Sequence, residues 1–201
     1  MTFAIGDALL PAILTARPMT DEEFSALCAE HPELHFEMTA EGELIVMAPT
    51  HSDTRARNFE LAGQLRQWAK KDGQGIGCDS STGFVLPNGA RRSPDASWTL
   101  TTRIAELGSN SRKSFWHLCP DFVIEVSSST DRIKPLQDKM IEYLTQGAQL
   151  GWLLDPENRS LEIYRPNGVT EQRTGIDTLA GEGPVAGFVL DLLALWDPLA
   201  N

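Results

Sequence analysis

The segment that most constrains the fold runs from Cys119 to Tyr143 and reads CPDFVIEVSSSTDRIKPLQDKMIEY. Residues 122–126 are almost entirely apolar, which is typical of a central strand covered on both faces. A turn-rich SSSTD follows, and residues 132–146 then have the pattern of a helix. A buried strand followed by a covering helix predicts an α/β arrangement. The one acid in the strand, Glu125, is costly to bury unless it is paired or coordinates a cation.

The rest of the chain predicts a mixed α+β sheet with a helix on each face, in one domain over residues 1–201. We divide it into an N-terminal helix and hairpin (18–49), a core (52–166) and a C-terminal extension (167–201). Residues 101–119 are expected to form a loop, and residues 167–187 show no clear pattern. The other expected elements are helices at 18–31 and 52–71, a hairpin of LHFEM and ELIVM, strands at 76–79, 83–86, 94–100, 150–156 and 161–166, and a strand or helix at 188–196.

The helix at 52–71 is expected to turn one apolar face to the core. That face is formed by residues at helical spacing: Phe59, Ala62, Leu65 and Ala69, with Leu61 and Trp68 alongside. The arginines and lysines of the same helix are expected to lie at the surface, Arg57 among them.

The charge of the chain is uneven along its length. The net charge is −11, which by itself argues against a nucleic-acid partner. Residues 1–43 carry −8 and residues 155–201 carry −5, whereas residues 44–154 carry +2. The segment that contains Glu125 is therefore weakly basic and permits a phosphate-bearing substrate. Three scattered cysteines suggest a reducing cytoplasm, and no apolar run is long enough to span a membrane.

Two acids and one lysine could form a metal site. Asp95 follows a proline at the start of a strand, and Glu125 lies within another strand. Two hard oxygen ligands on adjacent strands suit Mg²⁺ or Mn²⁺. Helical spacing places Lys139 at the edge of the buried face of its helix and Lys134 nearly opposite, so Lys139 is the lysine expected to reach the acids.

Each of these residues also has a purely structural interpretation. Glu125 could face solvent, Asp95 could bind turn amides, and Lys139 could lie along an apolar edge with its amine in water. Glu37, Glu60 and His51 are weaker candidates, since an exposed charge or a capping role explains each of them equally well. No GxSxG, HExxH, Walker or strand-linked GxGxxG motif is present, and the four histidines lack zinc-like spacing.

Several motifs, taken in order, resemble a known family. They are HFEMTAEGELIVMAPTH, PDASW, CPDFVIEVSSSTD, DKMIEY, GWLLDP and LEIYRP, which together lie within residues 18–166. In this order they resemble the Uma-type restriction endonuclease family, a member of the PD-(D/E)XK nuclease superfamily. The resemblance implies a restriction-endonuclease-like αβββαβ core and cleavage of phosphodiester bonds that depends on Mg²⁺ or Mn²⁺.

The resemblance also implies roles for individual residues. Asp95 matches the first acid of the superfamily motif and Glu125 the second, so both are expected to hold the metal. The motif lysine would stand at Ser127, and in the Uma-type pattern Lys139 occupies its place on the following helix. Glu37 matches an acid of the opening hairpin. Ser127 and Tyr143 are expected to support the site.

Two functions from different classes stay open at this stage. The first is a homodimeric, cytoplasmic endonuclease that cleaves DNA, with Lys139 assisting the attacking water. The second is a non-catalytic dimeric module that keeps the fold for binding or regulation; a hydrolase of another phosphoester would share the residues of the first. Nothing marks a base-reading motif, so DNA binding is expected to be weak and dependent on salt. The candidate phosphate contacts are Arg91 and Arg92, with Arg103, Arg112 and Lys113 as further basic residues.

Overall fold

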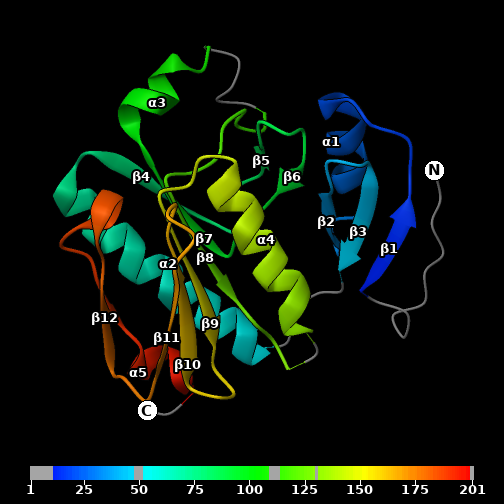
Figure 1. Ribbon diagram of the computed structural model, residues 1–201. Coiled ribbons are helices and arrows are strands. Elements are labelled where there is room, and N and C mark those ends of the chain that lie inside the picture. Colours follow the sequence, from blue (N-terminus) through cyan, green and yellow to red (C-terminus); the bar gives the residue numbers. More distant parts are fainter. Residues whose placement is uncertain (1–10, 48–51, 109–113, 130, 200–201) are drawn as a thin grey trace.

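A six-stranded sheet with helices on both faces forms the centre of the molecule, and a five-stranded sheet lies beside it (Figure 1). The computed structural model describes residues 11–47, 52–108, 114–129 and 131–199. The mixed α/β fold expected from the sequence is confirmed.

The central sheet is antiparallel except at one pair of strands. Its order is β11-β10-β9-β8-β7-β4, and only β8 and β9 run parallel. That pair is joined through helix α4 (Ile133–Thr145), whereas α2 (Ser52–Asp72) covers the opposite face (Figure 1). The strands are β4 (Gly75–Asp79), β7 (Ala96–Leu100), β8 (Phe122–Val126), β9 (Leu150–Asp155), β10 (Ser160–Tyr164) and β11 (Thr170–Thr174).

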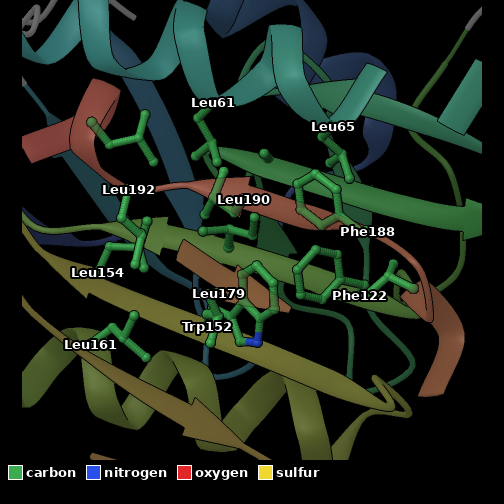
Figure 2. Packing of buried hydrophobic residues seen from close by; sticks show 14 of the residues in the cluster. Leu61, Leu65, Phe122, Trp152, Leu154, Leu161, Leu179, Phe188, Leu190 and Leu192 are labelled. Atoms are coloured by element: carbon green, nitrogen blue, oxygen red, sulfur yellow. The ribbon is translucent and has the colours of Figure 1, made fainter. Parts of the chain in front are cut away.

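All five residues of β8 are buried, as its apolar sequence predicts. Phe122, Ile124 and Val126 join the larger core, which α2 and the C-terminal segment cover (Figure 2). Phe122 meets Trp152 edge to face, with ring centroids 4.8 Å apart. Val123 points to the other face and packs with Met140 and other residues in a second core beneath α4. Alternation along one strand therefore separates two environments.

Helix α4 lies close to the sheet because Gly151 offers no side chain at the contact. A Cβ at this position would stand 2.4 Å from Met140 Cε and 3.4 Å from Val123 Cγ2. Met140 and Tyr143 are the buried residues of α4, in agreement with the predicted face. The close approach brings the side chains of α4 within reach of the strand that carries Glu125.

Helix α2 has the predicted length, but its buried face differs from the predicted one at Phe59 and Arg57. Its buried residues are Thr54, Arg57, Leu61, Leu65 and Ala69. Phe59 was expected in the core and is instead 82% exposed, and Arg57 was expected at the surface and is buried. The Arg57 guanidinium donates from Nε to the carbonyl of Leu195 at 2.8 Å, which gives one of its five N–H donors a partner inside the molecule.

The N-terminal region forms the second sheet, of order β1-β3-β2-β6-β5. The predicted hairpin is present as antiparallel β2 and β3. The predicted helix is α1 (Asp21–Glu30), and Thr20 and Glu23 form a capping box at its start. The strands are β1 (Ala12–Thr15), β2 (His35–Met38), β3 (Glu43–Met47), β5 (Phe84–Val85) and β6 (Arg91–Arg92).

Regular structure also forms where no element was predicted, at β1 and β6 and in two longer stretches. Helix α3 (Thr101–Glu106) begins the segment expected to be a loop, and it has no buried residue to give an apolar signal. Strands β11 and β12 (Thr178–Ala180) and a short 3-10 helix (Gly183–Val185) lie within 167–187, and β13 (Val189–Asp191) and α5 (Leu193–Trp196) close the chain. No helix among the described residues is both long and apolar enough to cross a membrane.

Candidate metal-dependent active site

Asp95 and Glu125 lie side by side at one end of the central sheet. Strands β7 and β8 are antiparallel with Ala96 opposite Ile124, so continuing this register by one residue places Asp95 opposite Glu125. The Val126 amide donates to Asp95 Oδ2 at 2.9 Å and fixes the first acid against the strand that carries the second. The structure therefore brings the two predicted acids together on adjacent strands.

Lys139 reaches Glu125 from α4. Its Nζ lies 2.9 Å from Glu125 Oε1 and 2.8 Å from Glu37 Oε1. Tyr143, one turn further along α4, donates its hydroxyl to Glu125 Oε1 at 3.0 Å. Lys134 is 71% exposed and pairs with Asp138 on its own helix. The helical geometry thus selects Lys139, as the spacing predicts.

Glu37 comes from the other sheet and closes the cluster. It is buried on β2 and accepts from three groups: Lys139, the guanidinium of Arg92 at 3.2 Å, and the Ser93 amide at 2.9 Å. Arg92 Nε also donates to Glu142 Oε2 at 2.6 Å. Glu37 therefore anchors the lysine rather than facing solvent, which was the alternative interpretation.

The charges in this cluster do not balance. Among the described residues, the ion pairs of Glu125, Glu37 and Glu142 involve two cations, Lys139 and Arg92, and the neighbouring Asp95 accepts hydrogen bonds from neutral groups. A buried site with an excess of carboxylates favours either protonation or a bound cation.

The pKa shifts follow from burial and from this imbalance. Burial raises the pKa of Glu125 to about 8, with Asp95 and Glu37 adding to the rise and Lys139 opposing it. Burial also raises the pKa of Asp95, although the Val126 amide acts against it. For Glu37, burial acts to raise the pKa, but Lys139 and Arg92 outweigh it and the pKa is lowered. Burial acts to lower the pKa of Lys139, yet Glu125 and Glu37 raise it, so the amine is protonated at neutral pH.

The residues at this end of the sheet fit a hard divalent cation that keeps several waters. Among the described residues, no group of three His, Cys, Asp or Glu side chains is arranged to hold a metal by itself. Mg²⁺ nevertheless commonly takes one or two carboxylates, with water and substrate phosphate as its other ligands. Asn58 adds a third oxygen nearby. Its Nδ2 donates to Asp95 Oδ1 at 2.7 Å, and its buried Oδ1 has no hydrogen-bond partner within the described part of the chain.

The motifs in the sequence did not single out Asn58 or Glu142. One signal for Asn58 was available: asparagine disfavours helix interiors, and Asn58 stands at the border of the buried face of α2, three residues before Leu61. Glu142 lies next to Tyr143 in α4 and gave no comparable signal, because its partner Arg92 comes from a distant strand.

The other candidates lie in different surroundings. Ser127 is buried beyond the end of β8, where its amide donates to the Leu154 carbonyl at 2.9 Å. Arg103 pairs with the fully buried Asp121 at 2.7 Å, and Glu60 accepts a hydrogen bond from Gln64 on its own helix. His51, Arg112 and Lys113 lie outside the described residues.

Arg91 and Arg92, the candidate phosphate contacts, are both 8% exposed and committed to partners inside the protein. Arg91 binds Asp21 at 2.9 Å and the Met19 carbonyl at 2.7 Å, and its guanidinium lies over the Phe24 ring. Arg92 joins Glu37 and Glu142. This geometry favours a structural role for both side chains. Contacts with a phosphate backbone would then have to come from other cations.

Two neighbouring pockets open near the site, and Asp95 lines the first of them. The first, of about 260 Å³, is lined by Asp95 and Asn58 together with Arg55, Phe59, Ala62, His35, Asp79 and Ser80. The second, of about 240 Å³, shares His35 and Ser80 with the first and extends along Arg91, Arg92 and Ser93. A substrate can therefore approach Asp95 from the side of α2.

The fold and the paired acids define a nuclease-like α/β domain. The sequence profile of the Uma2 family, described as "Putative restriction endonuclease", matches residues 21–193, and the chain belongs to this family. The fold is similar to that in the "Crystal structure of a putative nuclease belonging to DUF820" from Anabaena variabilis ATCC 29413. The TM-score is 0.72 at 23% identity, over 89% of this chain and 98% of that one. No curated protein matches the chain.

Proposed function

We propose that this protein is an endonuclease that hydrolyses phosphodiester bonds in DNA with the help of Mg²⁺ or Mn²⁺. One observation carries the proposal: Asp95 and Glu125 lie on adjacent strands while Lys139 contacts Glu125 from the helix that follows. Membership of a restriction endonuclease family supports the choice of DNA as the substrate.

Asp95 and Glu125 would hold the metal, and Asn58 would keep Asp95 oriented through its 2.7 Å hydrogen bond. The bound cation would supply positive charge at the phosphate and lower the pKa of its bound water. Tyr143 donates a hydrogen bond to Glu125 and would hold that carboxylate in place. Glu37 accepts from Lys139 and would orient the lysine amine in the same way.

Lys139 supplies charge rather than a base in this proposal. Its amine is protonated because Glu125 and Glu37 raise its pKa, so it cannot take a proton from the attacking water at neutral pH. It stabilises negative charge that develops on the phosphate, in the manner of a fixed cation. A lysine on α4 can serve this purpose although Ser127 occupies the usual strand position.

The decisive experiment compares the wild type with Asp95→Asn and Glu125→Gln on plasmid and linear DNA in Mn²⁺. We expect each variant to lose about a hundredfold to a thousandfold in rate, the range found for removing one electrostatic group from an active site. Asn58→Ala should lose about tenfold, because one hydrogen bond to a charged group contributes about 1.5–3 kcal/mol. Gln64→Ala, on the same helix, is the matched control. Equal cleavage by all variants would contradict the proposal.

A non-catalytic binding module is the second candidate, and one observation favours it. Lys139 is already in contact with the carboxyl groups of Glu37 and Glu125, and the described residues contain no three-ligand group for a metal. Calorimetric titration with Mn²⁺ separates the two candidates. The nuclease predicts binding that Glu125→Gln abolishes, and the module predicts no heat that depends on Glu125.

Two active sites allow both strands of a duplex to be cut in one binding event, so we include a homodimer in the nuclease proposal. Sedimentation equilibrium between low and high micromolar concentration tests it. If the protein is a monomer and still nicks one strand, the proposed hydrolysis stands and the proposed homodimer is contradicted.

A further inference from the structure

We infer that the exposed face of α2 is a track for a DNA strand and that Phe59 stacks on an unpaired base beside the bond to be cut. The inference rests on the proposed nuclease function and specifies the substrate as DNA with an unpaired base.

Phe59 is the first observation. It is 82% exposed, the highest value among the large hydrophobic side chains that the structure describes as exposed, and it is the one aromatic residue among them. It also lines the pocket that contains Asp95. A single exposed apolar side chain needs no explanation by itself, but one at the rim of a candidate active site does.

The cations of α2 are the second observation. At 100° per residue, Arg55, Phe59, Arg66 and Lys70 fall within an arc of about 60° on the helix, and we name these four residues the α2 stripe. All four are exposed. The acids of α2, which are Asp53, Glu60 and Asp72, lie at least about 80° away from the stripe. A chain of net charge −11 thus presents a face that carries three cations and no acid.

The stripe has a length and a direction. From Arg55 to Lys70 it extends about 22 Å at 1.5 Å per residue. It begins at the Asp95 pocket, whose lining includes Arg55, Asn58, Phe59 and Ala62. Among the described residues, no ion pair involves Arg66 or Lys70, so both charges are available to a phosphate backbone.

The interleaving of one aromatic ring with cations favours a single strand over a duplex. Single-strand binding combines a positive track along the backbone with aromatic side chains on which bases stack. In a duplex, both faces of each base are covered by its neighbours, and a base must leave the stack to offer a face. Phe59 therefore points to a substrate with an unpaired base next to the scissile phosphate, as in a single strand, a frayed end or a flap.

The test measures binding apart from chemistry. A fluorescein-labelled 20-nucleotide single strand and its duplex are titrated by anisotropy in Ca²⁺, for the wild type, Phe59→Ala, Phe59→Trp and Arg66→Ala/Lys70→Ala. We expect Phe59→Ala to weaken single-strand binding about tenfold and duplex binding less than twofold, and Phe59→Trp to bind as the wild type does. The double variant should reduce the slope of log affinity against log salt by about 1.4, since each single-strand phosphate contact contributes about 0.7.

Two control variants remove similar groups elsewhere on the surface. Val169→Ala removes another exposed apolar side chain, and Lys134→Ala removes an exposed lysine of α4. Neither should change binding. Equal losses on single strand and duplex would overturn the unpaired base, and unchanged binding in all α2 variants would overturn the track. A dimer that Phe59→Ala dissociates in sedimentation, with DNA binding unchanged, would assign the stripe to a second copy of the chain and likewise overturn it.

Cleavage in Mn²⁺ distinguishes failure of this inference from failure of the proposed function. If cleavage does not depend on Phe59, Arg66 or Lys70, the inferred DNA track is contradicted and the proposed nuclease function stands. If single-strand binding depends on Phe59 but the protein cleaves none of these DNAs, the nuclease function is contradicted. The track then remains as a surface that binds single strands.

Discussion

The two faces of strand β8 have opposite character: one is apolar, and the other carries a charged side chain. Phe122, Ile124 and Val126 face an apolar core beneath α2, while Glu125 faces Lys139 and Tyr143 beneath α4. One face contributes dispersion and hydrophobic burial, and the other gathers buried charges that cost free energy to desolvate. The difference teaches that stability and chemistry are separated here by a single step along the backbone.

The largest expected effect tests whether the apolar face of β8 contributes to stability without influencing the candidate metal site. Phe122→Ala should lower the free energy of unfolding by about 3–5 kcal/mol, because a fully buried ring in contact with Trp152 is replaced by a cavity. Urea denaturation measures the loss. Mn²⁺ affinity of the folded variant should stay within twofold of the wild type, and Val189→Ala, at an exposed site, should change neither quantity. A large loss of Mn²⁺ affinity would show that the two faces are not separate.

A comparable change on the charged face should act through unpaired carboxylates. Lys139→Met leaves Glu125 and Glu37 buried without their shared cation, and removing one partner of a buried pair costs about 3–5 kcal/mol. We expect about 3 kcal/mol in urea denaturation at pH 8, and less at pH 5, where Glu125 is protonated. Glu125→Gln in the Lys139→Met background should recover part of the loss. An additive double-mutant cycle would show that the two residues do not interact.

The smallest expected effect is that of a change of one pH unit. Because burial raises the pKa of Glu125 to about 8, the folded protein binds more protons than the unfolded chain between its ordinary pKa and that value. The contribution of Glu125 to stability is therefore complete at acidic pH and is lost as the pH rises toward 8, by at most about 1.4 kcal/mol per pH unit. Glu125→Gln should flatten this part of the stability profile. Mn²⁺ affinity should rise over the same range, since binding displaces the proton.

A matching profile in the Gln variant would assign the slope to another group. Glu37 acts in the opposite direction, because its lowered pKa gives stability that is lost as the pH falls below its ordinary value. Glu37→Gln therefore changes the acidic end of the profile, and it also reduces the rise of the Glu125 pKa, to which Glu37 contributes.

Periodicity was sufficient to predict the elements that position the site. β8, α4 and the β2–β3 hairpin each have either a continuous apolar run or a clear turn, so local sequence determines them. β11 reads TEQRT and is largely exposed at the edge of its sheet, and α3 buries no side chain, so neither has the apolar pattern on which such a prediction depends. Leu61, Leu65 and Ala69 were predicted in the buried face of α2 and are buried. Phe59 lies at the edge of that face and is exposed, because tertiary packing turns the helix toward Leu61 and Leu65.

The candidate site was predictable to the same degree. The position of Lys139 follows from helical geometry within one element, and Asp95 and Glu125 were expected on adjacent strands. The partners of Arg92 were beyond reach, since Glu37 and Glu142 lie 55 and 50 residues away along the chain. Contacts between distant segments depend on the tertiary fold, which local patterns do not encode.

The parallel pairing of β8 with β9 has a consequence for the order in which the molecule can assemble. The βαβ unit holds Glu125 and Lys139 only 14 residues apart, so their contact closes a short loop at low entropic cost. Glu37 is 102 residues from Lys139 and must arrive with the other sheet. During folding the lysine can therefore meet its first acid early, while the second acid reaches it only when the two sheets join.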